Sequence, residues 1–314
     1  MWVCGFFRPG TTGSGLRGSL QKEQVPQEVA DWIYNCMSPH SMFIGEIVDV
    51  IREMKKIEQI QFLNETLLDE MPQYRREAKR VPRNAEEQRY FLRCLMNVRE
   101  PGALSERFLI AQDELLSRER EEKGVVHVAE LPPVPSDERL VLWQGDITRL
   151  DADAIVNAAN ARLLGCFRPG HNCIDNVIHS AAGLQLREEC AAIMRAQGHE
   201  EPTGQAKLTG GYNLPARHVL HTVGPIIDGP LTDRDRELLA SCYRSCLALA
   251  EEKGLKSVAF CCISTGVFRF PKGEAARIAV ATVKETLQNS RIEKVVFCVH
   301  GDENLRIYQS LLLA

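Results

Sequence analysis

The amino-acid sequence predicts an α/β protein, in which a three-layer α/β/α sandwich with a mixed, mostly parallel sheet follows a helical N-terminal region. After about residue 139, short apolar runs alternate with longer segments of helical period, which is typical of parallel sheets covered by helices. Before it, apolar residues recur with helical period alone. We therefore expect a disordered, Gly-rich tail at 1–24, a helical region at 25–130, a linker at 131–135 and the sandwich at 139–314.

Two helices are well marked in the N-terminal region. The first, at 84–99, has an apolar face and begins at Asn84, with Glu87 in the capping-box position. The second opens at Ser105 and ends near Gly124. In the sandwich we expect strands at 139–143, 154–157, 218–221, 257–263 and 294–299, and helices at 175–195, 231–253, 272–289 and 303–313.

Composition narrows the class of partner and the compartment. The net charge of −4 over 314 residues gives no general attraction to nucleic acid or to an anionic membrane, and no apolar run approaches the roughly 20 residues of a membrane span. The 11 cysteines are scattered through apolar segments, which indicates reduced thiols in an intracellular protein. We expect a cytoplasmic monomer, with a mitochondrial transit segment as the alternative because no acidic residue precedes Glu23.

Chemically distinctive residues follow several of the expected strands, where α/β sheets bind ligands. Cys166, His171 and Cys173 form a C-x4-H-x-C pattern, and thiolate with imidazole suits zinc. Three protein ligands leave a coordination position open, as a catalytic zinc requires. Two alternatives remain, namely buried thiols beside a hydrogen-bonded histidine, or a structural zinc with a distant fourth ligand.

Three further motifs are weaker when each is taken alone. Asp146 follows a strand and could accept a hydrogen bond from an exocyclic amine such as that of adenine, or could simply stabilise a turn. The amides at 157–160 suit sugar hydroxyls, or could satisfy the loop backbone. The main-chain N–H groups around Gly266 could form a concave phosphate site.

Together these residues resemble the macrodomain family over 139–314. The resemblance rests on Gly-Asp-Ile-Thr at 145–148, Asp-Ala-Ile-Val-Asn-Ala-Ala-Asn at 153–160, Leu-Leu-Gly at 163–165, Ile-Asp-Asn-x-Ile-His-x-Ala-Ala-Gly at 174–183 and Ile-Ser-Thr-Gly-x-Phe-x-Phe-Pro at 263–271. Ordinary macrodomain hydrolases have a run of glycines after Leu-Leu-Gly. The Cys-Phe-Arg-Pro-Gly-His-Asn-Cys segment found here instead is similar to the zinc-dependent subfamily.

The resemblance implies binding of ADP-ribose and its removal from mono-ADP-ribosylated proteins, with Zn²⁺ as cofactor. It implies that Asp146, with Ile147 beside it, binds adenine, and that Asn160 binds the distal ribose. The other implied ADP-ribose contacts are Cys173, Ile174, Asp175 and Asn176 at a helix N-terminus, and Ser264, Thr265, Gly266, Val267 and Phe268 around the phosphates. Arg269 and His300 depart from the common pattern, in which a small or variable residue is expected at 269 and relatives often have an aromatic residue near adenine at 300.

The implied mechanism is hydrolysis of a protein–ADP-ribose bond. Zinc held by Cys166, His171 and Cys173 would coordinate a ribose hydroxyl or a water, and the catalytic residues would be Asp175, which acts on the attacking water, and Asn160, which fixes the ribose. One rival is a reader that binds ADP-ribose without cleaving it, although a reader needs neither the zinc nor Asp175. The other is a deacetylase of O-acetyl-ADP-ribose, whose site chemistry would be similar.

Overall fold

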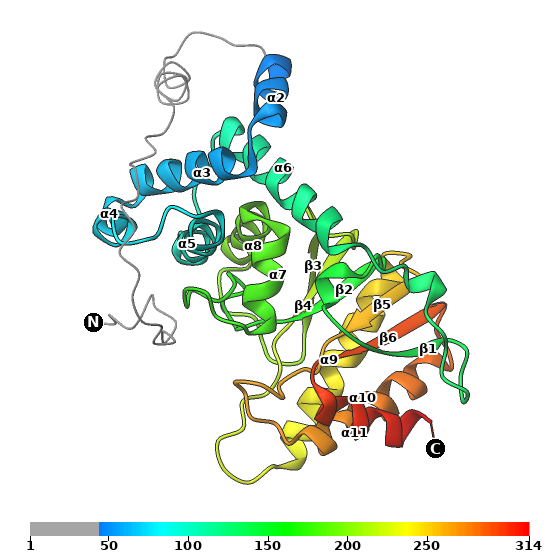
Figure 1. The fold of residues 1–314 in the computed structure, drawn as a ribbon. Coiled ribbons are helices and arrows are strands. Elements are labelled where there is room, and N and C mark those ends of the chain that lie inside the picture. Colours follow the sequence, from blue (N-terminus) through cyan, green and yellow to red (C-terminus); the bar gives the residue numbers. More distant parts are fainter. Residues whose placement is uncertain (1–43, 314) are drawn as a thin grey trace, which may run out of the picture. The chain divides into compact units, whose positions relative to one another are not determined.

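The computed structural model describes residues 44–313, which fall into two compact units (Figure 1). The first unit ends at Leu92 and the second begins at Arg93, inside helix α5 (Ala85–Val98) and well before the Pro-rich segment 131–135. The expected tail at 1–24 and the expected start of the helical region lie outside the described residues. Within residues 44–313, no helix is long and apolar enough to cross a membrane.

The first unit is helical, as the sequence predicts for this part of the chain. It contains α2 (Ile44–Glu53), α3 (Lys56–Glu70), a 3-10 turn η1 (Pro72–Tyr74), the short α4 (Arg75–Ala78) and the first part of α5. Its core includes Ile60, Leu63 and Leu67, all buried. Asn84 caps α5 as expected, because its Oδ1 accepts a hydrogen bond from the Glu87 main-chain N–H at 3.0 Å.

The second unit contains the sheet. Its strands are β1 (Leu140–Gln144), β2 (Ala154–Ala158), β3 (Ala206–Gly210), β4 (His218–Thr222), β5 (Ser257–Phe260) and β6 (Lys294–Val299). The order across the sheet is β1-β6-β5-β2-β4-β3, and every pair is parallel except β3 with β4. This confirms the mixed, mostly parallel sheet. Strand β3 is not predicted from the sequence, because it is a short, half-buried edge strand that lacks an apolar run.

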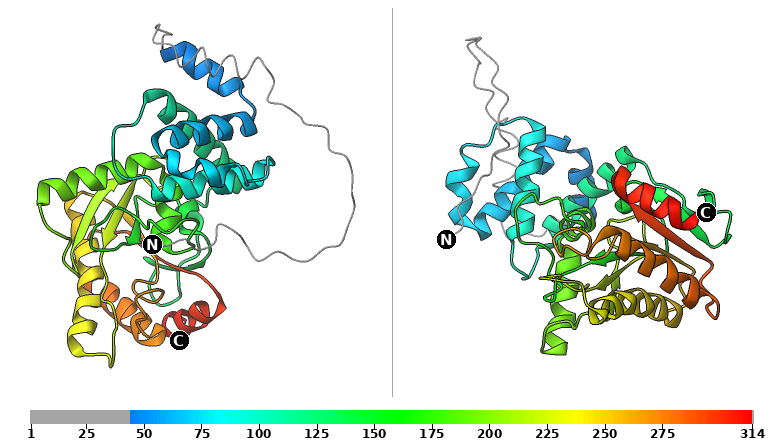
Figure 2. Two further views of the ribbon diagram at one scale, coloured as in Figure 1. Left: turned by 90° about the vertical axis from the view of Figure 1, so that its left-hand side faces the viewer. Right: turned by 90° about the horizontal axis from the view of Figure 1, so that it is seen from below.

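Helices cover both faces of this sheet (Figures 1 and 2). One face carries α7 (Ile174–Ala182) and α8 (Leu184–Gln197), and the other carries α9 (Asp233–Glu252), α10 (Lys272–Leu287) and α11 (Asp302–Leu312). The remainder of α5, helix α6 (Glu106–Lys123) and the 3-10 turns η2 (Val128–Glu130) and η3 (Ile147–Arg149) complete the unit. The three-layer prediction is therefore confirmed.

The single helix expected at 175–195 is wrong, because the chain breaks at Gly183. This residue adopts φ 98°, which a residue with a side chain avoids, and a Cβ there would lie 2.7 Å from Gln112 Nε2. Gln112 comes from α6, and its Oε1 accepts from the Leu184 N–H at the start of α8 at 2.9 Å. A contact from a distant helix thus divides the expected element into α7 and α8.

The strand order places the predicted ligand loops at one edge. β2 and β5 are parallel neighbours, so the loops that follow them leave the sheet side by side. From β2 the chain continues toward β3 and β4, whereas from β5 it continues to β6. Such a reversal of direction opens a crevice at the carboxyl ends of the strands, and this is where α/β sheets bind ligands.

Asp153 anchors the opposite edge of the sheet. Its Oδ2 accepts hydrogen bonds from the main-chain N–H groups of Lys256, at 2.6 Å, and Ser257, at 3.0 Å, where β5 begins. Its Oδ1 pairs with Arg217, which precedes β4. Burial alone would raise the pKa of this carboxyl, but the bonds from Arg217, Lys256 and Ser257 outweigh burial and hold the pKa below its ordinary value.

We expect Asp153→Ala to lower the free energy of unfolding at pH 7 by about 2 kcal/mol, because three donors lose a charged acceptor. Since the folded-state pKa is lowered, this stabilisation is present above the unfolded-state pKa near 3.8 and is lost as the pH falls through the folded value. Urea unfolding at pH 7 and at about pH 3 measures both effects.

The matched control is Glu237→Ala, which removes an exposed ion pair with Arg244 and should change the free energy of unfolding by no more than about 0.5 kcal/mol. A difference between Asp153→Ala and wild type that is equally large at both pH values would contradict the assigned role of the carboxylate.

Candidate functional site

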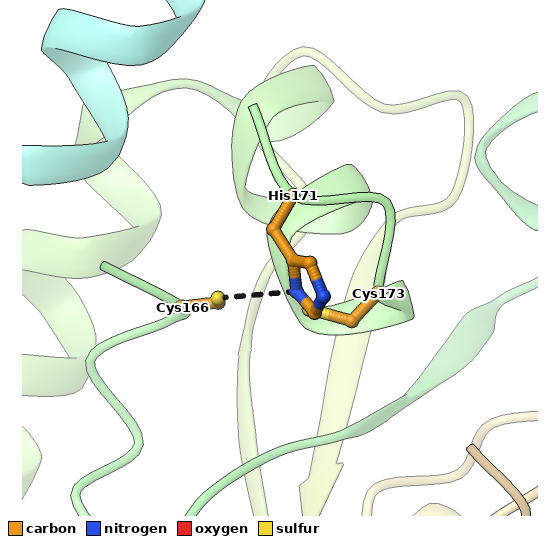
Figure 3. Close-up of side chains that lie close together, drawn as sticks. All are labelled: Cys166, His171 and Cys173. Atoms are coloured by element: carbon orange, nitrogen blue, oxygen red, sulfur yellow. Dashed lines mark hydrogen bonds between the residues drawn. The ribbon is translucent and has the colours of Figure 1, made fainter. Parts of the chain in front are cut away.

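The C-x4-H-x-C residues lie together in the loop between β2 and α7 (Figure 3). We call residues 164–173 the metal loop, because its three donor side chains could hold an ion. Cys166 Sγ is 3.6 Å from His171 Nδ1, and the ligand atoms of Cys166, His171 and Cys173 all lie within 4.8 Å of one another. All three side chains are partly buried. Two sulfurs and one imidazole nitrogen converging in this way fit the donor set and the size of a zinc site.

The two thiols differ in acidity. The pKa of Cys166 is lowered to about 5, chiefly because the Cys173 thiol donates a hydrogen bond to its thiolate. The pKa of Cys173 is raised, chiefly by that same hydrogen bond and then by burial. One thiolate is therefore already favoured at neutral pH, and a thiolate is the form that binds a metal.

Gly165 shapes the start of this loop. It adopts φ 81°, and a Cβ there would lie 2.9 Å from the His179 ring. Gly170 also has a positive φ, of 60°, just before His171. The loop therefore turns twice in conformations that suit glycine, and its first turn lies directly against α7.

Asp175, predicted to be catalytic, is buried in the first turn of α7. Asn157 Nδ2 donates to Asp175 Oδ1 at 2.8 Å, and Asn160 Nδ2 donates to Oδ2 at 3.2 Å. Burial raises the pKa of the Asp175 carboxyl to about 6, although the bond from Asn157 opposes this. The structure thus brings both predicted catalytic residues together, with Asn157 as a second amide on the same carboxylate.

A buried histidine that no sequence motif predicted, His221, contacts Asn157. Asn157 Nδ2 also donates to His221 Nδ1 at 3.2 Å, and His221 Nε2 donates to Thr209 Oγ1 at 2.9 Å. Burial lowers the pKa of His221 to about 3, so the ring is neutral. His179 Nε2 lies 3.5 Å from Asp175 Oδ1, one turn further along α7. His179 lies four residues after Asp175 on α7, and this helical spacing could have suggested it from the sequence. His221 could not be found in this way, because it comes from β4, far away along the chain.

Two residues predicted to bind ADP-ribose are engaged within the protein. Asn160 Nδ2 donates to the Gly165 carbonyl at 3.0 Å as well as to Asp175, so this amide fixes the metal loop. The Asn176 side chain is fully buried and donates to the carbonyls of Cys166, at 3.3 Å, and Arg168, at 3.0 Å. Both residues therefore support the loop.

Helix α7 begins at Ile174, with Cys173 as its N-cap. The N–H groups of the first helical turn have no partners within their own helix, so Ile174 and Asp175 offer main-chain donors to an anion. The predicted anion site therefore shares its first residues with the metal loop.

At the end of β1, Asp146 stabilises a turn. Its Oδ1 accepts from the Thr148 N–H at 3.0 Å and the Thr148 hydroxyl at 2.7 Å, which makes Asp146 the N-cap of η3. These two bonds use Oδ1 alone, so Oδ2 takes no part in the cap. Ile147, predicted to lie beside adenine, is 2% exposed and belongs to the hydrophobic core.

The loop after β5 forms a compact turn. The Phe270 N–H donates to the Ser264 carbonyl at 3.0 Å, and Ser264 and Arg269 adopt φ 63° and φ 60°. These strained conformations hold Gly266 and Val267 at the surface, and Val267 is 67% exposed. The positive φ at Arg269 is a backbone conformation that favours glycine.

Comparisons with known proteins agree with this arrangement. The family model described as "Macro domain" matches residues 156–279. A protein of Treponema medium named "Protein-ADP-ribose hydrolase" is 52% identical over 262 residues, which cover 82% of this chain and 100% of the relative. A protein of the same name from Staphylococcus aureus (strain MSSA476) is 49% identical over 73% of this chain and 86% of its own length.

Two solved structures are also similar. The Trypanosoma brucei macrodomain in complex with ADP-ribose is 36% identical with a TM-score of 0.55, over 67% of this chain and 91% of that one. The Oceanobacillus iheyensis macrodomain with ADP is 40% identical with a TM-score of 0.51, over 55% of this chain and 88% of that one. The strand order, the loop positions and these relatives lead to one conclusion: the chain belongs to the macrodomain family.

Proposed function

We propose that this protein is a zinc-dependent hydrolase that removes ADP-ribose from mono-ADP-ribosylated proteins. The observation that carries the proposal is the convergence of Cys166, His171 and Cys173 immediately before a buried carboxylate, Asp175. Relatives at about 50% identity that are named protein-ADP-ribose hydrolases support the reaction class. A protein that only binds ADP-ribose would need neither the thiol pair nor the buried carboxylate.

Cys166, His171 and Cys173 would hold the zinc. A zinc with three protein ligands lowers the pKa of a water or hydroxyl in the fourth position and orients it. Two thiolates balance the charge of the ion, so the site would be electrically neutral and suited to orienting a sugar. The preformed Cys166 thiolate supports metal uptake at neutral pH.

Asp175 would take the proton from the attacking water. The amides of Asn157 and Asn160 each donate to one oxygen of the carboxylate, so its plane is fixed. The remaining lone pairs on these oxygens can accept from a water. The helical N–H groups of Ile174 and Asp175 would bind the pyrophosphate, and the turn at 264–268 would enclose it from the neighbouring strand. Asp146 Oδ2 would accept from the adenine amine.

We expect Cys173→Ala to lose zinc and to reduce turnover of an ADP-ribosylated protein by at least about 100-fold, because one of three ligands is removed. Zinc content and release of ADP-ribose are measured on the same samples. Cys246→Ala, which removes a buried thiol on α9, is the control and should keep both. Turnover that persists in the zinc-free Cys173→Ala variant would leave the metal with only a structural role.

We expect Asp175→Asn to keep zinc and ADP-ribose binding but to slow turnover by about 10²- to 10⁴-fold, the usual contribution of a general base. Asp233→Asn, an exposed change on α9, should leave turnover as in wild type. A wild type that binds ADP-ribose and takes up zinc but releases no ADP-ribose from proteins modified on several side-chain types would favour the reader. Turnover confined to O-acetyl-ADP-ribose would favour the deacetylase.

Gly165→Ala should abolish zinc retention and turnover, since its Cβ would meet the His179 ring in a backbone conformation that already disfavours side chains. Gly198→Ala is the matched control, because Gly198 has a similar φ of 77° and nothing lies within 4 Å of the added Cβ. That change should cost about 1 kcal/mol of stability and leave zinc in place. Equal zinc contents in the two variants would refute the packing role of Gly165.

A further inference from the structure

The main-chain carbonyls of the metal loop are bound by a side chain from outside the loop. Arg93 in α5 donates from Nη2 to the His171 carbonyl at 2.8 Å. The same guanidinium donates to Asn176 Oδ1 from Nη2 at 2.9 Å and from Nε at 3.3 Å. Asn176 in turn donates to the carbonyls of Cys166 and Arg168. Arg93 therefore reaches one metal-ligating residue directly and another through one intervening amide.

A second residue of the same helix also binds the loop. Asn97, one turn after Arg93, accepts from the Gly170 N–H through Oδ1 at 3.0 Å. Its Nδ2 donates to Ser180 Oγ at 3.1 Å, and Ser180 Oγ donates to Asn176 Oδ1 at 3.2 Å. Arg93, Asn176, Ser180 and Asn97 thus form a continuous network that begins and ends on the loop.

The amides of this network are buried. Asn97 is 2% exposed and Asn176 is fully buried, so a lost partner would leave a buried polar group without a hydrogen bond. The loop between Cys166 and Cys173 has no regular secondary structure, and its main-chain groups depend on side chains for partners.

We infer that Arg93 and Asn97 are positioning residues that hold the metal loop in its ligating conformation, so that zinc retention depends on a helix outside the segment that matches the family model. The inference rests on the proposed zinc site. Without these two side chains the loop would have to become ordered each time it binds the ion. Outer partners that orient ligands typically contribute 10- to 100-fold in metal affinity.

The test uses the full chain as wild type, Arg93→Ala, Asn97→Ala and a control, Arg120→Ala. Arg120 donates to a main-chain carbonyl as Arg93 does, that of Asn213 at 3.1 Å, but the carbonyl lies outside the metal loop. Each protein is loaded with Zn²⁺, and loss of the ion to excess chelator is followed in time. The thiolate-to-metal absorption of the Co²⁺-loaded proteins reports the geometry of the site, and melting of the metal-free proteins reports their stability.

We expect zinc loss at least about 10-fold faster in Arg93→Ala and in Asn97→Ala than in wild type, with altered Co²⁺ absorption and wild-type rates in Arg120→Ala. Zinc loss at the wild-type rate in both α5 variants would overturn the inference, and so would equal acceleration in the control. If Arg93→Ala does not fold, Asn97→Ala and the milder Arg93→Lys decide. A wild type that takes up no zinc would overturn the zinc site itself, a result distinct from a zinc-loaded wild type matched by its variants.

Discussion

The buried carboxylate of Asp175 is the constraint on which the rest of the site depends. Burying a carboxylate is costly unless donors surround it, and here the amides of Asn157 and Asn160 supply them. These donors come from β2 and from the loop that follows it, while the acceptor comes from α7, so satisfying one charge fixes three segments against one another. Because Cys173 immediately precedes α7 as its N-cap, the same interaction also fixes one end of the metal loop.

Two arginine side chains bind the metal loop. Arg187 in α8 donates from Nε to the Leu164 carbonyl at 2.8 Å, and its guanidinium lies 4.4 Å from the centre of the Phe167 ring. Burial lowers the pKa of Arg187 to about 10. This value is still far above neutral pH, so the side chain stays charged. Arg93 holds the other end of the loop at the His171 carbonyl. These contacts restrict a segment without regular structure, and such restriction would preorganise the proposed zinc site.

The proposed function would combine two kinds of binding at one helix terminus. The first N–H groups of α7 can attract an anion, while the residue before them, Cys173, would be a ligand of the proposed zinc site. A ligand whose pyrophosphate is bound at this terminus would bring its neighbouring sugar close to the thiols and to Asp175. The parallel pairing of β2 with β5 adds the turn at 264–268 on the other side. Binding and chemistry would therefore be positioned by the same few main-chain groups.

Features of this protein that depend on near neighbours along the chain could be predicted from the sequence. An apolar run predicted β6 with its observed bounds, and the capping residues Asn84 and Ser105 predicted where two helices begin. The spacing of Cys166, His171 and Cys173 predicted three donor side chains that the structure brings together. Contacts between segments that are distant along the chain could be seen only in the tertiary structure. Gln112 of α6 accepts from the Leu184 N–H at the start of α8, His221 of β4 binds Asn157, and Arg93 of α5 binds the metal loop. No local pattern encodes these contacts, because hydrogen bonds between remote side chains leave no periodicity in the sequence.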